Sequence, residues 1–347
     1  MPNPQGMALR WLTNCFNSQP IAIHLGSDVV RMMQIRGTKD RHLQSAVEVV
    51  SSDSGAIKVA LSSFNGKKCV VSIASSEVLV QHVRVPIEAD ENEIRNRLMQ
   101  HDKQWADAEI RHTGITTTGS SGNPRQEMIC VGIEAEKIMK IISIINEAGG
   151  EVLAVTVPLY ASLRAFDQLY RRDGDEKITS LLIDMDEDSS VVMIAHGANC
   201  VFAHRFDSVH KIENKESETK QDVTQSLRPI TTAQVENEFE RRGENEPRGL
   251  IGVQYSNESI EEKLTVELER CLRHHDALFP ERAVDRVIFT GQGAINTEKC
   301  AAIASKLGIA GYVSDPSAWI EGAKDYVSSP AWTTSAGICM RYAEEAA

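Results

Sequence analysis

Two short glycine turns carry the residue types that could bind a phosphate group. The first, Gly26-Ser27, lies between two apolar runs that together span Ile21–Ile35 and are rich in β-branched residues. Glycine supplies the positive φ that a tight hairpin turn requires, and the flanking residues favour strands. Successive backbone N–H groups in such a turn can point to an anion, but any β-hairpin has the same pattern. Considered alone, this stretch predicts a hairpin and leaves open whether it binds a phosphate.

The second turn, Gly291-Gln292-Gly293, follows the apolar strand predicted at Val284–Thr290 and precedes a helix predicted at Glu298–Leu307. A turn in front of a helix presents free N–H groups, which suit a nucleotide phosphate. A purely structural turn explains the same residues when they are considered alone. The turn therefore gains meaning only from the rest of the chain.

A third turn is acidic and joins the strands predicted at Thr179–Met185 and Ser190–Ala195. Its alternating Asp184, Asp186 and Asp188 are similar to the start of a calcium-binding loop, but the glycine and the distal glutamate of an EF-hand are absent. The sequence also contains no Gly-x-Ser-x-Gly, no Walker lysine loop and no metalloprotease helix. No catalytic residue is assigned. The adjacent histidines 274 and 275 cannot face one ligand from a helix and are interpreted as surface or packing residues.

Composition excludes several classes of partner. The net charge of −12 argues against nucleic acid and anionic lipid, which both attract basic proteins. The seven cysteines are scattered without a Cys-x-x-Cys pair, which argues against disulfide or zinc frameworks and indicates a reducing compartment. No apolar run reaches the roughly 20 residues of a membrane helix, and no secretion signal is present. A cytoplasmic protein is expected.

The predicted elements form a repeat. Each half of the chain runs strand, turn, strand, strand and helix, which predicts an α/β protein with ligand space between two lobes. Asp90 with Glu93 forms a capping box, and Gly149 is a predicted C-cap. Helices are predicted at residues 56–64, 90–105, 134–148, 158–169, 232–242, 257–278, 298–307 and 333–346. Further strands are predicted at residues 68–74, 81–86, 110–117, 127–133, 151–157, 200–206 and 311–313.

Taken together, five stretches resemble the PilM family, the actin-like proteins of type IV pilus assembly. The order and spacing of these stretches agree from about residue 19 to the C-terminus. FtsA and the cytoplasmic region of GspL have the same architecture and are more distant alternatives. The five stretches are IAIHLGS with VVRMMQI, VSIASSEVLVQHVRVPIEADENEI, VLAVTVPLYASLRAF, LLIDMDEDSSVVMIAHGANCVFAHRF and ELERCLRHHDALFPERAVDRVIFTGQGA.

The resemblance implies an actin-like ATPase fold (ribonuclease H-like) with two lobes and a 1C-type inserted subdomain. The expected ranges are a leader at 1–18, lobe I at 19–176 with subdomain 1A and the 1C-like insert at about 87–150, and lobe II at 177–347. Lobe II would hold subdomain 2A and a 2B-like part at about 207–283. The family's role further implies a cytoplasmic adaptor at the inner face of the inner membrane, held there through its partners. Those partners are a PilN-like membrane protein, whose cytoplasmic N-terminal segment enters a groove of 1A and 1C, and other pilus assembly platform proteins.

The resemblance also implies a site for ATP with magnesium between the lobes, at positions that depart from the family pattern. His24 replaces an aspartate, and a neutral imidazole is a poor partner for magnesium. Asp186 replaces a glycine, and its charge would repel a phosphate at about 4 Å by about 4 kcal/mol at an effective dielectric near 20. The family's Gly-Gly-x-x-x-Thr motif appears here as Lys220-Gln221-Asp222-Val223-Thr224, without its glycines. The implied nucleotide-binding residues are His24, Gly26, Ser27, Asp184, Asp186, Thr224, Gly291 and Gly293.

Three hypotheses of function follow. The first is an adaptor that hydrolyses little or no ATP and binds it weakly, with the strand Val78–Val85 as one wall of its peptide groove. The second is a slow ATP-binding or ATP-hydrolysing enzyme of this fold, such as a sugar-kinase relative, which the loss of the aspartate at His24 disfavours. The third is a polymer-forming protein similar to FtsA, for which the short acidic Tyr342–Ala347 offers no membrane anchor.

Overall fold

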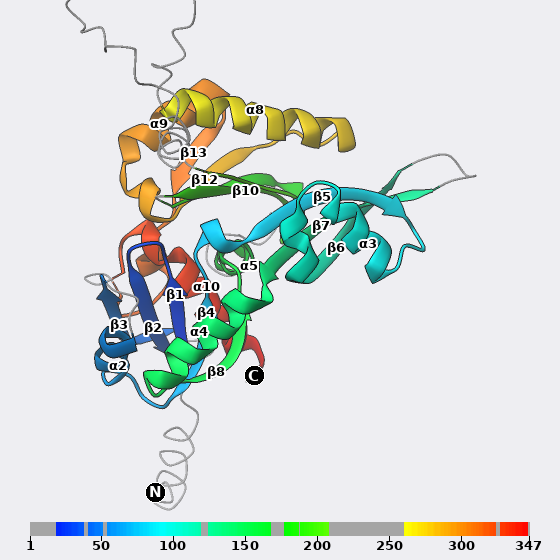
Figure 1. The fold of residues 1–347 in the computed structure, drawn as a ribbon. Coiled ribbons are helices and arrows are strands. Elements are labelled where there is room, and N and C mark those ends of the chain that lie inside the picture. The colour runs from blue at the N-terminus through cyan, green and yellow to red at the C-terminus, as the bar shows by residue number, and fades with distance from the viewer. Residues whose placement is uncertain are drawn as a thin grey trace, which may run out of the picture.

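The computed structural model describes residues 19–37, 41–50, 54–118, 124–167, 177–186, 188–207, 260–323 and 327–345. These residues form two lobes that lie one above the other, with a third, smaller sheet at their side (Figure 1). Each lobe is built on one five-stranded sheet.

The lobe I sheet is built around β1, Ile21–Leu25, in which every residue is buried. β1 pairs antiparallel with β2 and parallel with β4, which gives the strand order β3-β2-β1-β4-β8. Central strands that are covered on both faces need apolar residues throughout, and this explains the continuous apolar run of β1. The other strands are β2, Val30–Arg36; β3, His42–Val49; β4, Lys68–Ser72; and β8, Glu151–Thr156.

The lobe II sheet repeats this topology. Its central strand β9, Thr179–Met185, pairs antiparallel with β10 and parallel with β12, in the order β11-β10-β9-β12-β13. The repeat predicted from the sequence is therefore present in both sheets. The other strands are β10, Ser189–His196; β11, Asn199–Asp207; β12, Arg286–Thr290; and β13, Ala310–Val313.

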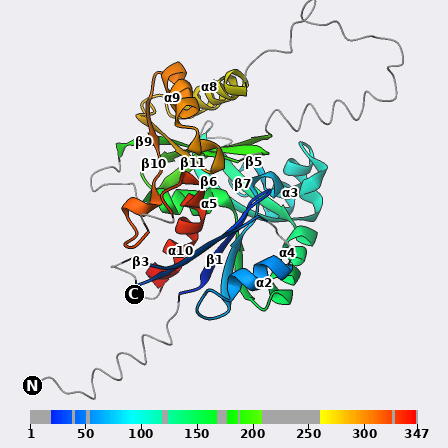
Figure 2. The same ribbon diagram turned by 90° about the vertical axis from the view of Figure 1, so that its left-hand side faces the viewer.

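Helices cover both faces of the lobe I sheet (Figure 2). Ile57 of α2 and Ile145 of α4 are fully buried against one face. On the other face α5 and α10 cross so closely that a Cβ atom on Gly337 would stand 1.8 Å from the carbonyl oxygen of Ala161. The ranges are α2, Ser54–Leu61; α4, Ala135–Glu147; α5, Pro158–Ala165; and α10, Thr333–Glu345.

Two further helices pack on the lobe II sheet: α8, Ile260–Leu278, and α9, Thr297–Leu307. Leu268 and Ile303 are fully buried between these helices and the strands. Gly308 ends α9 with a φ of 67°, as a C-cap glycine does. Among the described helices, none has both the length and the apolar character to cross a bilayer.

The third sheet has the order β5-β7-β6, and its pairs are antiparallel. Its strands are β5, Leu79–Pro86; β6, Ala108–Thr118; and β7, Arg125–Glu134. We expected an insert of three strands and two helices within residues 87–150. The strand β5 precedes residue 87, and α4 packs against α2 on the lobe I sheet, whereas α3, Glu91–Met99, packs on the third sheet. The domain ranges themselves stay predictions.

The prediction of one helix at residues 90–105 is wrong in its second half. The helix is α3, Glu91–Met99, and the side chain of Asp90 accepts a hydrogen bond from the Glu93 N–H at 2.8 Å, as the capping box predicts. A separate 3₁₀ turn then begins at Asp102, whose carboxylate accepts from the Gln104 N–H at 2.9 Å. Each carboxylate caps a new element, so the chain bends between them.

Several predictions lie outside the described residues. They concern the leader 1–18, most of the turn at 119–124, the lobe boundary at 171–176 and the chain from 208 to 259, which includes Lys220 and Thr224.

Candidate functional site

The turn between β1 and β2 carries His24, Gly26 and Ser27. The Gly26 N–H donates to the Val29 carbonyl oxygen at 2.9 Å, and a Cβ atom on Gly26 would stand 2.8 Å from that same oxygen. The expected positive φ at Gly26 is wrong. The turn instead requires glycine because the backbone of Val29 approaches it closely.

His24 is buried in β1, between its pairing partners Arg31 on β2 and Ser72 on β4. Burial, and then the positive charge of Arg31, lowers the pKa of His24 to about 3, so its ring is neutral at neutral pH. Within the described part of the chain, His24 Nδ1 and Ser27 Oγ are buried without hydrogen-bond partners. Unpaired buried polar atoms are costly, and at this turn they could bind a polar ligand.

The facing turn in lobe II lies directly on the end of β9. Thr290 Oγ1 donates to Asp184 Oδ1 at 2.9 Å. Gly291 has a φ of 82°, and a Cβ atom there would stand 2.5 Å from the Met185 carbonyl oxygen and 2.7 Å from Asp184 Oδ1. At Gly293 it would stand 2.9 Å from Met185 Cβ. Both glycines are therefore required for this contact.

Asp184 carries the titratable carboxyl group of this turn. Burial, and then the charge of Asp186, raises the pKa of Asp184 to about 7, while the hydrogen bond from Thr290 opposes this rise. Asp186 itself lies in the hairpin turn, where its N–H donates to the Ser189 carbonyl oxygen at 2.9 Å. Near neutral pH the Asp184 carboxyl group is therefore partly protonated.

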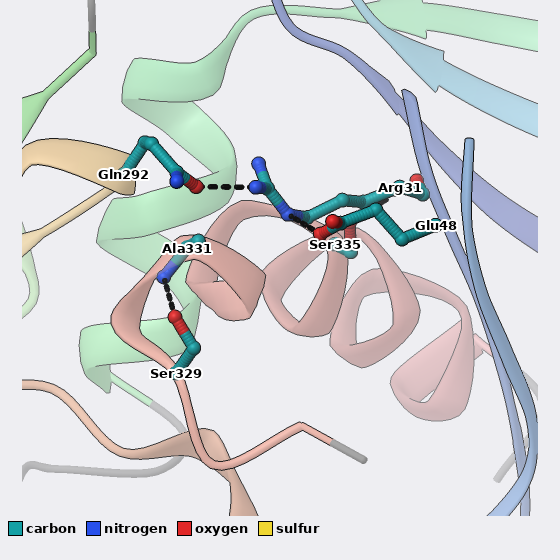
Figure 3. Close-up of polar contacts among 6 residues, drawn as sticks. All are labelled: Arg31, Glu48, Gln292, Ser329, Ala331 and Ser335. Carbon is teal, nitrogen blue, oxygen red and sulfur yellow. Dashed lines mark hydrogen bonds and ion pairs between the residues drawn. The ribbon is translucent and has the colours of Figure 1, made fainter. Parts of the chain in front are cut away.

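Arg31 joins the two lobes at this site (Figure 3). Its side chain is 6% exposed, and its Nε donates to Glu48 Oε2 on β3 at 2.8 Å. The same guanidinium donates to the side-chain oxygen of Gln292, which lies in the glycine turn of lobe II. The planar fork of arginine makes both bonds at once. Arg31 therefore links the β1–β2 hairpin to the Gly291–Gly293 turn.

A second contact joins β5 of the third sheet to β11 of lobe II. His82 Nε2 accepts from the Ala203 N–H of β11 at 3.0 Å, and its ring stacks on Phe202 with centroids 4.7 Å apart. Arg205 also donates to the Ser76 carbonyl oxygen at 2.8 Å. Burial lowers the pKa of His82 to about 3. β5, which we expected to form one wall of a peptide groove, contacts lobe II through His82.

A long cavity lies along α5. Two cavities, of about 610 and about 310 Å³, share Tyr160, Leu163 and Ala198, and we call them together the α5 trough. A mostly apolar lining with a few polar groups is typical of ligand-binding sites. The larger cavity is lined by Thr113, Gly114, Ile115, Ile129, Leu159, Tyr160, Leu163, His196, Ala198, Asn199, Cys200, Val201, Phe279 and Arg282.

The structure thus gathers the predicted site residues at two facing turns, apart from Thr224, which is not described. Arg31 and Thr290 also belong to the site but were not among the residues predicted from the sequence. Arg31 had a signal, because a charged residue inside the apolar run VVRMMQI must be paired when the strand is buried. Thr290 had none, because threonine is common in strands. The described residues include no group of three or more His, Cys, Asp or Glu side chains that could hold a metal ion.

No protein-family model matches the chain, and no curated protein matches it significantly. Solved structures do match. A chain of the PilM–PilN type IV pilus biogenesis complex has a TM-score of 0.64 and 12% identity, over 94% of this chain and 98% of that one. At this identity the likeness establishes the fold alone, and it confirms the actin-like, two-lobed α/β fold with an inserted subdomain.

Two other solved structures have lower scores. A Bacteroides thetaiotaomicron protein with an actin-like ATPase fold and unknown function has a TM-score of 0.47 and 12% identity, over 89% of this chain and 94% of that one. The cytoplasmic domain of EpsL, an inner-membrane component of the Vibrio cholerae type II secretion system, has a TM-score of 0.39 and 15% identity. This match covers 60% of this chain and 80% of that one.

Proposed function

We propose that this chain is an actin-like adaptor of a type IV pilus or related secretion assembly platform. It binds the cytoplasmic N-terminal segment of an inner-membrane PilN-like protein, and through this partner it is held at the cytoplasmic face of the membrane. The α5 trough is the observation that carries the proposal. The fold, shared with a chain of the PilM–PilN complex over nearly its whole length, supports it.

The strand β6 is the element on which such a peptide would dock. Among the described strands, β6 pairs with β7 alone, and Thr113, Gly114 and Ile115 of β6 line the trough. An extended peptide can add to a free strand edge through backbone hydrogen bonds, while alternate side chains enter pockets. Leu159 and Leu163 of α5 supply the apolar wall opposite. The peptide site thus lies at β6 and not at β5.

ATP with magnesium binds weakly in this proposal, and turnover is at or near background. A magnesium nucleotide is a poor match for the residues at the two turns. His24 offers a neutral ring, Asp184 is partly protonated near neutral pH, and the Arg31 guanidinium is already bonded to Glu48 and Gln292. Magnesium prefers ionised carboxylates and water. We therefore assign no catalytic step to these residues.

A slow ATPase is the second candidate function. Among the described residues, the unpaired buried atoms His24 Nδ1, Ser27 Oγ and Ser189 Oγ favour some polar ligand near the two turns. A polymer-forming role similar to that of FtsA is a further alternative, which sedimentation of the purified protein with and without ATP would test.

The direct test is fluorescence polarisation with a labelled peptide. The peptide is the cytoplasmic N-terminal segment of a PilN-like inner-membrane protein from the same organism. Leu163→Arg places a charge in the trough and should abolish binding. Leu153→Arg is the matched control, because Leu153 is 43% exposed on β8 and does not line the trough. Equal binding by both variants, or no binding by the wild type, would refute the proposal.

A further inference from the structure

One end of the α5 trough holds the positively charged side chain of Arg282. Arg282 follows α8, is half-buried, and lines the larger cavity together with Phe279. Within the described part of the chain, its guanidinium takes part in no ion pair or hydrogen bond. A guanidinium beside an apolar cavity is poorly hydrated, so its pairing with an anion is strengthened there.

Among the residues that line the larger cavity, Arg282 supplies the positive charge. No aspartate or glutamate is among the residues that line the larger cavity. His196 also lines it and forms a hydrogen bond through Nε2 to Nε2 of the fully buried His275, at 2.9 Å. One ring of this pair must donate and the other accept, so the accepting ring is neutral when the bond is formed. Burial lowers the pKa of both histidines, which agrees with this arrangement.

We infer that the peptide bound in the α5 trough carries an acidic side chain that pairs with Arg282. This inference rests on the proposed function and adds to it the chemistry of the partner. Arginine binds a carboxylate through two parallel hydrogen bonds, which fixes the direction of the peptide as well as its affinity. Apolar side chains before or after the acidic residue would contact Ile115, Leu159 and Leu163.

The form of the cavity favours a peptide over a small free carboxylate. The cavity at Arg282 shares Tyr160, Leu163 and Ala198 with the second cavity, whose lining also includes Arg164, Asp167 and Gly337 of α10. A small molecule would fill one cavity, whereas an extended chain can occupy both. The strand edge of β6 beside the larger cavity adds backbone groups that only a peptide can satisfy in register.

A displayed library of short random peptides tests the inference without a known partner. It is selected in parallel against the full chain, Arg282→Glu, Leu163→Arg and the control Arg273→Glu. Arg273 lies on the same helix, α8, is 66% exposed and does not line the trough. The expected result is enrichment by the wild type and Arg273→Glu of apolar peptides with Asp or Glu at one fixed position. Arg282→Glu should lose that preference and select Lys or Arg there.

An enriched peptide is then synthesised with its acid and with Asn or Gln in its place. Removal of the acid should weaken binding to the wild type about three- to fivefold and leave binding to Arg282→Ala unchanged. Enriched peptides without an acidic position, or with the same position in Arg282→Glu, would overturn the inference and leave the proposed function intact. If the wild type enriches nothing beyond what Leu163→Arg enriches, the peptide site itself fails, and the inference fails with it.

Discussion

Asp184 makes the stability of this protein depend on pH. Its pKa in the folded state is about 7, against an ordinary value of 3.8, so between these values the folded state binds the proton more tightly than the unfolded state. Folding therefore loses stability as pH rises through this window, by at most about 1.4 kcal/mol per pH unit. Asp184→Asn cannot ionise and keeps an oxygen to accept from Thr290. Its free energy of unfolding relative to the wild type should therefore rise from pH 4 to pH 7.

Urea unfolding of both proteins across that pH range measures the effect. The difference between the variant and the wild type isolates Asp184 from the other carboxyl groups. A difference that stays constant with pH would show that the environment of Asp184 does not raise its pKa.

His24 and Asp186 are the residues to which we attribute weak nucleotide binding. His24→Asp places a carboxylate beside the Arg31 guanidinium, and Asp186→Gly removes a negative charge from the second turn. The double variant should bind ATP with magnesium at least about tenfold more tightly than the wild type. The repulsion between Asp186 and a phosphate is about 4 kcal/mol, and a tenfold change in affinity needs only about 1.4 kcal/mol. Isothermal titration calorimetry checks this. Micromolar binding by the wild type would contradict our account, and an unimproved double variant would move the cause to the geometry of the lobes.

Residue-level prediction succeeded where chemistry is local and failed where it depends on a distant neighbour. The need for glycine at position 26 could be predicted, but its reason could not, because the close approach of Val29 is a property of the folded turn. The bond from Arg31 to Gln292 joins residues far apart in the chain, and a single sequence gives no sign of that pairing.

The turn after β12 is the element that depends most on glycine. Gly291→Ala would bring a Cβ atom within 2.7 Å of both Met185 O and Asp184 Oδ1 at a positive φ. We expect it to lower the free energy of unfolding by about 3 kcal/mol or more. Gly308→Ala is the control, because Gly308 also has a positive φ but no atom lies within 4 Å of its added Cβ. It should cost about 1 kcal/mol, as a left-handed alanine does. Equal losses in the two variants would mean that the contact with β9 is unimportant.

At the level of elements, the starts of helices could be predicted, but the end of α3 and the edge strand β3 could not. Caps are readable from sequence, so Asp90 correctly starts α3 and Gly149, with a φ of 89°, ends α4. The helix was extended too far because Trp105 continues the apolar period after the chain has bent at Asp102. The strand β3 received no prediction of its own, because its residues are largely half-buried and give no continuous apolar run.

The hydrogen bond from Arg31 to Gln292 joins the two lobes, and a conservative substitution can test it. Gln292→Ala removes this bond but leaves the ion pair of Arg31 with Glu48. Hydrogen exchange should become faster in the β1–β2 hairpin and in the Gly291–Gly293 turn. Because a single hydrogen bond is worth about 1 kcal/mol, the overall stability should change little. Unchanged exchange at both turns would show that the bond does not hold the lobes together.

The two-lobed fold could be predicted because both halves of the chain have the same order of strands and helices. The α5 trough could not, since its lining comes from β6, α5, the β10–β11 turn and the chain after α8. Pockets formed by elements so far apart have no local sequence pattern. The position of β5 against β11, because of which we propose a peptide site at β6 instead, depends in the same way on how the third sheet packs on lobe II.

The central claim is that this chain binds a membrane partner's peptide without help from a nucleotide. It is tested most directly by calorimetric titration of the PilN-like N-terminal peptide into the full chain, first alone and then with saturating ATP and magnesium. The account predicts micromolar binding in both titrations with the same dissociation constant. Binding that occurs only with nucleotide, or no binding in either titration, would contradict it.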